Sequence, residues 1–371
     1  MRPLFEPALV NDAFGDPGLY ADFRDERRAL LFDLGDVSAL VPRKLLRISD
    51  IFVSHAHIDH FVGFDRWLRV VLGRKPRVAV YGGPGFIGQV GHKLAAYTWN
   101  VVHRYEVALT IEAHELAPDG GGRRARFSSL RRFAREQEQP WSPQGDVLLA
   151  EDRFRVRAAF LDHDIPCLAF ALEEAVQVNV WKNRLAELGL PTGAWLQSVK
   201  RAVIAGAPDD TPIEVQWHDR SGVHGATRCL GELRGTLELV PGRRIGYVTD
   251  IRHTEENLRA LERLLAGVDI LFIESVFLDA ETDHAERKNH LTAAQAGSIA
   301  RRLGARAVVP LHFSPRYEGR AAELQAEVQA AWRGEGGATT QPPSARRSMP
   351  GGMPTRLCTG APAPVPPAAQ R

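Results

Sequence analysis

Four residues near the start of the chain have the types and the spacing of a metal-binding motif. His55, His57, Asp59 and His60 lie within six positions, directly after the apolar run of residues 51–53. Neutral imidazoles and carboxylates are the ligands that zinc and related divalent metals take in proteins. A solvated, histidine-rich turn is the alternative, and it needs no further ligands from elsewhere in the chain. The rest of the sequence therefore decides between the two.

Three further candidate ligands each follow an apolar, strand-like run. His163 comes two residues after one such run, Asp250 directly follows another, and His312 closes a third. Loops at one edge of a sheet are where a rigid scaffold presents reactive side chains, so we expect these residues to meet the first cluster. Taken singly, Asp250 could begin a turn and His312 could be a hydrogen-bonded core histidine. Together they supply the partners that a metal site requires.

The seven residues are enough for two divalent metal ions that share one carboxylate. The donor mix suits zinc, with manganese or iron as alternatives. Two bridged metals lower the pKa of a shared water towards about 7 and bind a phosphate oxygen, which is the chemistry of phosphodiester hydrolysis. A carboxylate that ligates through one oxygen can accept the proton of that water through the other, so Asp59 is the predicted general base. The predicted ligands are His55, His57 and His163 for the first metal, Asp59, His60 and His312 for the second, and Asp250 as the bridge.

Short β-rich runs alternate with helical patterns along the chain, which predicts an α/β sheet covered by helices. Thr292 and Gln295 form a capping-box pattern at the start of one helix, and Gly304 is placed to end it. Residues 112–150 are predicted to be a long, partly ordered insertion. The predicted strands span residues 29–34, 50–54, 77–82, 154–161, 167–173, 245–249, 270–275 and 307–312, and the predicted helices span 64–72, 86–97, 254–267, 292–304 and 321–333.

The composition excludes several classes of protein. Of the 371 residues, 44% are hydrophobic and 25% are charged, which is ordinary for a soluble globular protein. No apolar stretch approaches a membrane span, and the N-terminus lacks the apolar core of a signal peptide. The three cysteines are too far apart for a disulfide framework or a metal-binding pair, so we expect a reducing cytoplasm. Residues 334–371, rich in Gly, Pro and Ala, are predicted to be a disordered tail.

The net charge of +2 does not by itself indicate a nucleic-acid partner. Arginine is nevertheless concentrated at residues 123–135. A solvated surface segment and a patch that binds phosphates are both open for this stretch.

Several motifs together resemble the metallo-β-lactamase superfamily, and more narrowly ribonuclease Z, the endonuclease family that trims 3′ trailers from precursor tRNA. The most specific is the His-x-His-x-Asp-His cluster at 55–60. "LHFSPRY" (311–317) is similar to the family's His-Phe-Ser-x-Arg-Tyr signature, and "FDLGD" (32–36) to its Asp-x-Gly motif. "FIESVF" (272–277) stands in the place of its His-Glu-Ala-Thr motif, and "NHLTAAQA" (289–296) in that of its His-Ser-Thr segment. The resemblance implies an αββα sandwich over residues 1–333, with a dinuclear site at one sheet edge.

The resemblance also implies roles for residues around the metals. Asp33 is the expected carboxylate that orients a metal ligand. His290 would donate a proton to the leaving 3′-oxygen while Glu274 accepts a hydrogen bond from its other ring nitrogen. A solvent-exposed residue at a helix N-terminus is the alternative for His290. Arg316 would bind phosphate through two N–H groups, with a surface salt bridge as its alternative.

The segment "VNVWKNRLAELGLPTGAWLQSVKR" (178–201) resembles the protruding arm with which this family clasps the tRNA elbow. The predicted domain therefore carries an arm at about 176–203, with a solvated helical hairpin as the alternative. The implied partners are precursor tRNA and, because these enzymes are commonly homodimers, a second copy of the chain. The residues of the arm expected to contact RNA are Lys182, Arg184, Lys200 and Arg201.

Two other functions stay open at this point. A hydrolase of the same fold could act on small esters, as a cyclic-nucleotide phosphodiesterase, a lactonase or a sulfatase. The predicted arm argues against a small-ester hydrolase, because an enzyme for small molecules has no need of a long basic arm. A catalytically silent RNA-binding scaffold is the other possibility, and the complete set of seven predicted ligands argues against that one.

Overall fold

The computed structural model describes residues 3–219 and 222–335, apart from the side chain of Asp219. The described residues form one compact unit. Residues 336–371, which make up nearly all of the predicted disordered tail, lie outside the described residues. Among the described helices, none has the length and the hydrophobicity that crossing a membrane would require.

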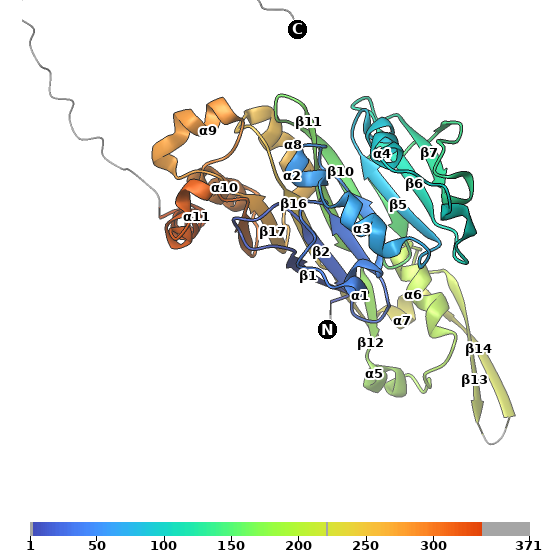
Figure 1. Cartoon of the computed structure of the whole chain (residues 1–371). Helices are drawn as coiled ribbons and strands as arrows, with labels where there is room; N and C mark the ends of the chain where they lie inside the picture. The colour runs from blue at the N-terminus through green and yellow to red at the C-terminus, as the bar shows by residue number, and fades with distance from the viewer. Residues whose placement is uncertain (1–2, 220–221, 336–371) are drawn as a thin grey trace, which may run out of the picture. The chain divides into compact units, whose positions relative to one another are not determined.

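Two β-sheets lie face to face and enclose a core rich in aromatic side chains (Figure 1). Phe32 and Phe52 of the first sheet face Phe170 and Tyr247 of the second, with ring centroids 5.6 to 6.1 Å apart. The first sheet has the order β1 (Phe5–Leu9), β2 (Leu19–Phe23), β3 (Ala29–Phe32), β4 (Ile48–Phe52), β5 (Arg77–Gly82), β6 (Thr110–Leu116), β7 (Gly122–Ser128) and β8 (Gln139–Pro140). The second has the order β18 (Val308–Leu311), β17 (Ile270–Glu274), β16 (Arg244–Val248), β11 (Pro166–Glu174), β10 (Phe154–Asp162) and β9 (Val147–Glu151).

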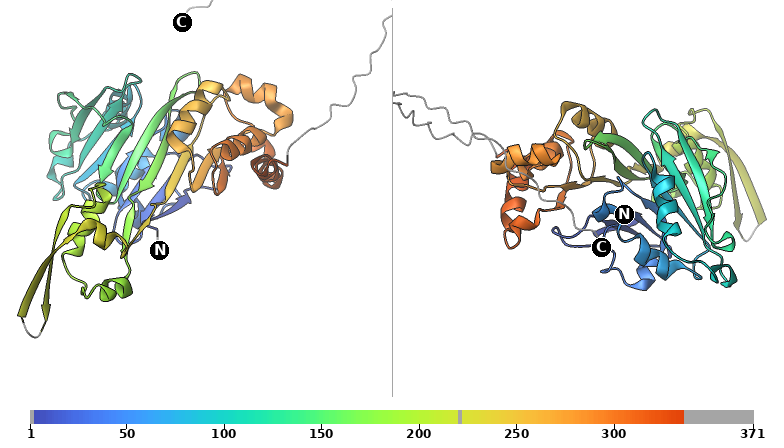
Figure 2. Two further views of the ribbon diagram at one scale, coloured as in Figure 1. Left: turned by 180° about the vertical axis from the view of Figure 1, so that it is seen from behind. Right: turned by 45° about the horizontal axis from the view of Figure 1, so that its top comes forward.

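Helices cover the outer face of each sheet, which gives the four layers of an αββα sandwich (Figure 2). Trp67 and Val90 bury their side chains against the first sheet, and Leu261 and Ile299 against the second. The helices of the first side are α1 (Pro42–Leu45), α2 (Ile58–Phe61), α3 (Phe64–Val71) and α4 (Phe86–Ala95), and those of the second are α8 (Glu255–Leu265), α9 (Thr282–Lys288), α10 (Ala293–Arg302) and α11 (Ala321–Arg333). Short 3-10 turns lie at Val102–Arg104, Ser129–Arg131, Asp279–Glu281 and Pro315–Tyr317.

Parallel strands bring the candidate ligands to one edge of the sandwich. β3 to β6 run parallel in the first sheet, and β16 to β18 run parallel in the second. Asp33 follows β3, and the cluster at 55–60 follows β4. In the second sheet Asp250 and His312 come just after β16 and β18, and Glu274 ends β17. Because the carboxyl ends of parallel strands point the same way, the loops that carry these residues share one edge.

The predicted strands and helices are all present, with ends that agree to within about two residues. The strand at 77–82 and the helix at 321–333 have the predicted bounds. The capping box of Thr292 and Gln295 forms as expected. The αββα fold class is therefore confirmed.

The prediction that residues 112–150 form a partly ordered insertion is wrong. They contain most of β6 and the whole of β7, which extend the first sheet. The charges that suggest a loop pair with one another across the two strands: Glu112 binds Arg126, and Glu115 binds Arg123. Two of the clustered arginines are thus engaged in ion pairs, which favours the solvated-surface alternative for that stretch.

One buried carboxylate joins three strands of the second sheet. Glu173 on β11 accepts hydrogen bonds from Arg155 (2.6 Å) and Arg157 (2.9 Å) on β10 and from Arg244 (3.2 Å) on β16. Burial raises the pKa of Glu173, but the hydrogen bonds from Arg155 and Arg157 outweigh it and hold that pKa below its usual value.

Glu173→Ala is expected to lower the free energy of unfolding at pH 7 by about 3 kcal/mol, because it removes the buried carboxylate that three guanidinium groups share. A carboxylate with a depressed folded pKa stabilises the protein above its unfolded pKa of about 4.3, and this contribution is lost as the pH falls through the folded value. Urea denaturation at pH 7 and near pH 3 measures both effects. Glu151→Ala, which removes a half-exposed partner of Arg28, is the control and should cost less than about 1 kcal/mol. An equal loss for Glu173→Ala at both pH values would contradict this account.

The arm is larger than the segment predicted at 176–203. It leaves the body after β11 and returns at β16, and its first and last strands pair with each other, Gln177 opposite Val240. Its own apolar core includes Leu185, Trp195 and Val215. Its elements are β12 (Gln177–Val180), α5 (Lys182–Glu187), α6 (Leu196–Ile204), β13 (Pro212–Asp219), β14 (Gly222–Cys229), α7 (Leu230–Arg234) and β15 (Leu237–Val240).

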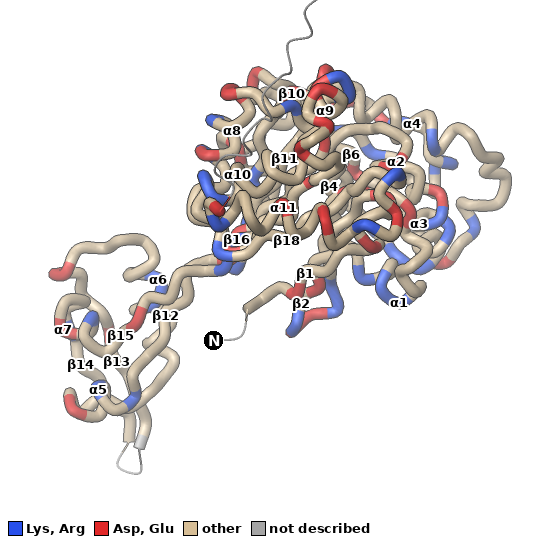
Figure 3. Tube along the Cα trace, turned by 90° about the vertical axis from the view of Figure 1, so that its left-hand side faces the viewer, with Lys and Arg blue, Asp and Glu red and all other residues tan. Residues whose placement is uncertain are grey.

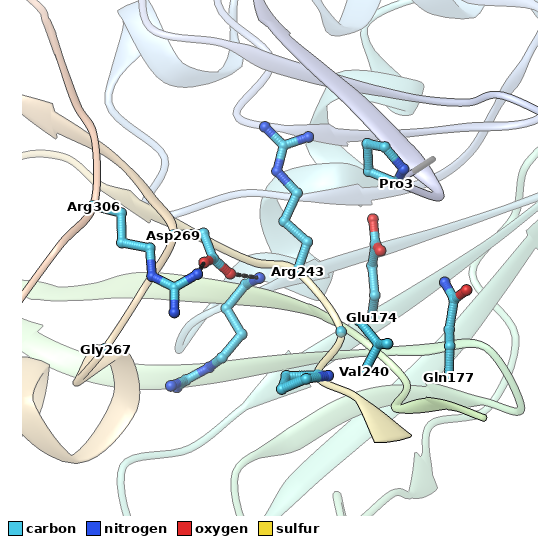
Figure 4. Close-up of a pocket in the computed structure, with 11 residues that line it drawn as sticks. Pro3, Glu174, Gln177, Val240, Arg243, Gly267, Asp269 and Arg306 are labelled. Atoms are coloured by element: carbon cyan, nitrogen blue, oxygen red, sulfur yellow. Dashed lines mark hydrogen bonds and ion pairs between the residues drawn. The ribbon is translucent and has the colours of Figure 1, made fainter. Parts of the chain in front are cut away.

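A cavity of about 510 Å³ lies at the root of the arm (Figure 4). It is lined by Gln177 and Val240 from the arm, and by Asp269 and Arg306 of the body, which form an ion pair of 2.9 Å. Where the chain re-enters the body, a Cβ at Gly242 would come within 1.9 Å of the carbonyl oxygen of Glu174, so only glycine fits there. None of the predicted site residues lines this cavity.

Candidate metal centre

The structure brings the residues predicted for the first metal together. His55, His57, His163 and Asp250 each offer one ligand atom, and these four atoms lie within 4.8 Å of one another. The Nε2 atoms of His55 and His163 are each 3.5 Å from Oδ2 of Asp250. Three of the four residues are buried, and only His57 is exposed.

The residues predicted for the second metal also meet. Asp59 Oδ2 lies 3.4 Å from His60 Nε2 and 3.3 Å from His312 Nε2. Asp250 reaches this group as well: its Oδ2 is 3.4 Å from His60 Nε2, and its Oδ1 is 2.9 Å from His312 Nδ1. Asp250 therefore stands between the two groups, as a bridging ligand would.

Several nitrogens at this centre are buried without a hydrogen-bond partner. They are Nε2 of His55, Nε2 of His60 and Nδ1 of His312, which lies close to Asp250 but without hydrogen-bond geometry. Leaving a buried polar atom unsatisfied costs about 1–3 kcal/mol, so three in one place call for an explanation. A divalent metal supplies it, since it accepts a lone pair from each imidazole. The donor set and the orphaned atoms both fit metal binding.

Neighbouring groups orient the imidazoles for that role. His163 Nδ1 lies 2.8 Å from the carbonyl oxygen of Asn289, which leaves Nε2 for a metal. His60 Nδ1 lies 2.8 Å from Oδ2 of Asp33, and this carboxylate also accepts hydrogen bonds from Tyr247 Oη and from the backbone and hydroxyl of Ser54. Asp33 thus has the geometry that an orienting carboxylate requires.

Three residues of the site have a strained backbone. Asp33, Asp250 and His312 have φ angles of 57°, 49° and 60°, in the left-handed region that non-glycine residues rarely occupy. Asp33 and His312 directly follow β3 and β18, and Asp250 comes two residues after the end of β16. Strain of this kind costs of the order of 1–3 kcal/mol per residue and gathers at functional sites. This backbone conformation directs the three side chains towards the sheet edge that they share.

The charges prepare the ligands for a metal in different ways. Burial lowers the pKa of His55 to about 2, so this imidazole is neutral and its lone pair is available. Burial raises the pKa of Asp250, but His312 and His60 outweigh it and hold that pKa well below its usual range. Burial alone would lower the pKa of His312, yet the Asp250 carboxylate raises it to about 10.

A buried carboxylate and a histidine lie beside the metal ligands. Glu274, at the end of β17, is fully buried; its Oε2 lies 2.8 Å from His290 Nδ1, and its Oε1 accepts the backbone N–H of Ile251 at 2.7 Å. The rings of His290 and His163 have centroids 5.1 Å apart. His290 is partly buried, which disfavours the solvent-exposed alternative. Burial lowers the pKa of His290, but the Glu274 carboxylate outweighs it and holds that pKa above its usual value.

Two of the predicted phosphate-binding arginines have partners within the protein. Arg316 pairs with Glu281 and lies over the ring of Phe277 at 5.6 Å, which is the surface salt bridge given as its alternative. Arg184 donates to the carbonyl oxygen of Gly235 at 2.7 Å, so it holds the arm together. By contrast, no ion pair is found for Lys182, Lys200 or Arg201 within residues 3–219 and 222–335.

Sequence reasoning missed the supporting residues Tyr247, Ser54 and Asn289. Tyr247 lies in an apolar strand, where a tyrosine is expected to be part of the core, and Asn289 contributes only its carbonyl oxygen. The loop at residues 11–17 also lies beside the site. In the structure the carbonyl oxygen of Ala13 accepts the backbone N–H of Phe313 at 2.6 Å, so this loop packs beside His312.

Proteins of known family show to which family this chain belongs. It is 32% identical over 333 residues to ribonuclease Z of Deinococcus radiodurans, an alignment that covers 88% of this chain and 95% of the relative. The chain belongs to the ribonuclease Z family. Ribonuclease Z of Natronomonas pharaonis is 31% identical, over 84% of this chain and 86% of that protein.

A family model and a solved structure are also similar to the chain. The model of the beta-lactamase superfamily domain matches residues 226–313, which contain Asp250 and His312. The crystal structure of the metallo-β-lactamase fold protein YhfI from Bacillus subtilis superposes with a TM-score of 0.50 at 14% identity, covering 88% of this chain and 92% of that one. At that identity the likeness concerns the fold alone. Members of this family depend on divalent metal, which agrees with the donor set.

Proposed function

We propose that this chain is a metal-dependent endonuclease that removes 3′ trailers from precursor tRNA. The observation that carries the proposal is the convergence of all seven predicted ligands beside the Glu274–His290 pair. The near full-length similarity to proteins named ribonuclease Z supports the choice of substrate.

The proposed metal sites share the Asp250 carboxylate. His55, His57 and His163 hold one divalent ion, and Asp59, His60 and His312 hold the other, with zinc favoured by the donors and manganese or iron as alternatives. When bound, such ions lower the pKa of water and offset the charge that develops on the phosphate.

Two side chains move protons in the proposed reaction. Asp59 presents Oδ2 to His60 and His312, so its Oδ1 remains to accept a proton from the attacking water. His290 binds Glu274 through Nδ1, so its Nε2 remains to donate a proton to the leaving 3′-oxygen. Glu274 keeps that ring protonated and correctly turned.

The arm is the proposed contact surface for the body of the tRNA. Residues 182–204 carry Lys182, Arg184, Lys200 and Arg201 against Glu187 alone, although the rest of the arm is rich in acidic residues. Figure 3 shows where the charged residues lie along the chain. Phosphates are attracted to such a local excess of cations, and each contact adds to the salt dependence of binding.

Arg201→Ala is expected to raise KM for precursor tRNA several-fold and to reduce the salt dependence of binding by about one counterion. Turnover of a small diester should be unchanged. Arg228→Ala is the matched control, because Arg228 is on the arm but pairs with Glu232. Equal effects of the two variants would contradict a specific RNA contact at Arg201.

A parallel assay separates the proposed function from hydrolysis of small esters. The zinc- or manganese-loaded protein is given a 3′-extended precursor tRNA and, separately, bis(p-nitrophenyl) phosphate, with Asp59→Ala as control. Cleavage of the precursor next to the discriminator base, abolished in the variant, is the expected result. Turnover of the diester alone would overturn the tRNA proposal and favour a small ester as substrate.

Three further properties are proposals as well. A homodimer is expected from the family, with the arm of one subunit serving the substrate of the other, and sedimentation of the purified protein tests it. The division into a hydrolase domain of residues 1–333 and a disordered tail, and a location in the cytoplasm, stay predictions from the sequence.

A further inference from the structure

Exposed apolar side chains lie on the segments that carry the proposed metal ligands. Ile58 is 78% exposed, the highest value of any large apolar side chain in the part of the chain that the structure describes. Val62 and Ile165 are 40% and 39% exposed. Burying a side chain of this kind is worth about 1.5–3 kcal/mol, so a fold leaves one open at such a position at some cost. The proposed active site itself therefore carries an unburied apolar surface.

These side chains come from the segments that supply the ligands. Ile58 stands between His57 and Asp59, so its Cα lies about 3.8 Å from theirs. Val62 directly follows α2, and Ile165 is in the turn between β10 and β11, where its carbonyl oxygen accepts the backbone N–H of His163 at 3.1 Å.

The loop at 11–17 brings a further apolar group to the His312 side. Phe14 packs edge-on against Phe313, with ring centroids 5.4 Å apart, and it is only partly buried. The apolar groups thus lie on both the His163 and the His312 sides of the centre.

We propose that Ile58, together with Val62 and Ile165, forms an apolar wall that contacts the unpaired nucleobases on either side of the scissile phosphate. This inference rests on the proposed function, since a phosphodiester held at the metals brings its two nucleosides to this wall. Every base has an apolar face, and contact with that face does not depend on the sequence. The three side chains have no donor or acceptor with which to read a base edge, which suits an enzyme that accepts trailers of different sequence.

A permanent protein partner is a poorer occupant of this wall. Ile58 is flanked by two proposed metal ligands, so a surface that buried it would also cover His57 and Asp59 and close the site. A substrate base comes and goes with the phosphate and leaves the site open between turnovers.

The test compares Ile58→Ser with the parent on two precursor tRNAs, one with an ordinary first trailer nucleotide and one with an abasic nucleotide there. The variant is expected to cleave the ordinary precursor with kcat/KM about tenfold lower. On the abasic precursor the parent should lose a similar factor, and the variant should lose nothing more. Metal content, measured by plasma mass spectrometry, should be the same in both proteins. Val41→Ser is the matched control, because Val41 is 58% exposed at the start of α1 and should have no effect.

Three results would overturn the inference. The first is an Ile58→Ser variant that cleaves the ordinary precursor like the parent. The second is an equal loss on both precursors, since the side chain would then not act through the base. The third is a parent that self-associates while Ile58→Ser does not, which would make the wall a subunit interface. A parent that cuts neither precursor would overturn the proposed function itself, and this inference with it.

Discussion

Asp250→Ala is expected to lose both metal ions and to reduce phosphodiester cleavage about a thousandfold or more. The carboxylate approaches both sets of ligands: Oδ2 lies 3.4 to 3.5 Å from Nε2 of His55, His60 and His163, and Oδ1 lies beside His312. Without it, five clustered imidazoles and Asp59 alone would have to bind two divalent ions. Metal content by plasma mass spectrometry and the cleavage rate of precursor tRNA measure the two losses together. His57→Ala should weaken the first metal alone.

Asp269→Ala is the control for this experiment. Asp269 is likewise an aspartate next to a strand of the second sheet. It pairs with Arg306 at the root of the arm, away from the predicted ligands. The Asp269→Ala variant should keep both metals and the parental rate. Circular dichroism should show that the parent, Asp250→Ala and Asp269→Ala are all folded. If Asp250→Ala kept two metals and the parental rate, the bridging role would be wrong.

His290→Ala is expected to lower kcat for precursor tRNA by about 10² to 10⁴ while both metals stay bound. The reason is the position of the ring, held by Glu274 at 2.8 Å and beside His163 and His312, whose ring centroids lie 5.1 and 5.5 Å away. The variant has lost the proposed proton donor but keeps all seven predicted metal ligands. Single-turnover cleavage and metal analysis are the measurements.

A second variant tests the role of the Glu274 charge. Glu274→Gln retains the size of the side chain but removes its charge, so it should lower kcat less than His290→Ala and leave the metals in place. His284→Ala, a histidine of α9 that packs on Phe277, is the control. Loss of a metal in His290→Ala would instead make His290 a ligand, an arrangement that its closeness to Asp250 and His312 also permits.

The positions of the predicted ligands could be read from the sequence because the geometry of parallel sheets is simple. Asp250 and His312 each follow a short apolar run, and parallel strands carry the residues after such runs to one edge. The central strands are buried on both faces, so their apolar runs are unambiguous. The same reasoning covers Asp33, although its contact with His60 comes only from the fold.

The features that were missed depend on information that a linear pattern does not carry. The strands β6 and β7 resemble a loop in sequence because they carry many charges, which pair across the two strands as Glu112 does with Arg126. The hydrogen bond of Tyr247 to Asp33 joins residues from different sheets, and the carbonyl of Asn289 has no side-chain signature. The end of the arm was missed because its closing strand, β15, pairs with a segment more than fifty residues earlier.

Cleavage of a 3′-extended precursor tRNA during titration of the metal-free protein with zinc tests the central claim most directly. The account predicts that the rate rises to a plateau at two metal ions per chain, and that the product ends at the discriminator base. Full activity at one ion per chain, or cleavage that persists in excess chelator, would contradict a dinuclear centre built on Asp250. A protein that binds two ions and leaves the precursor intact would contradict the substrate.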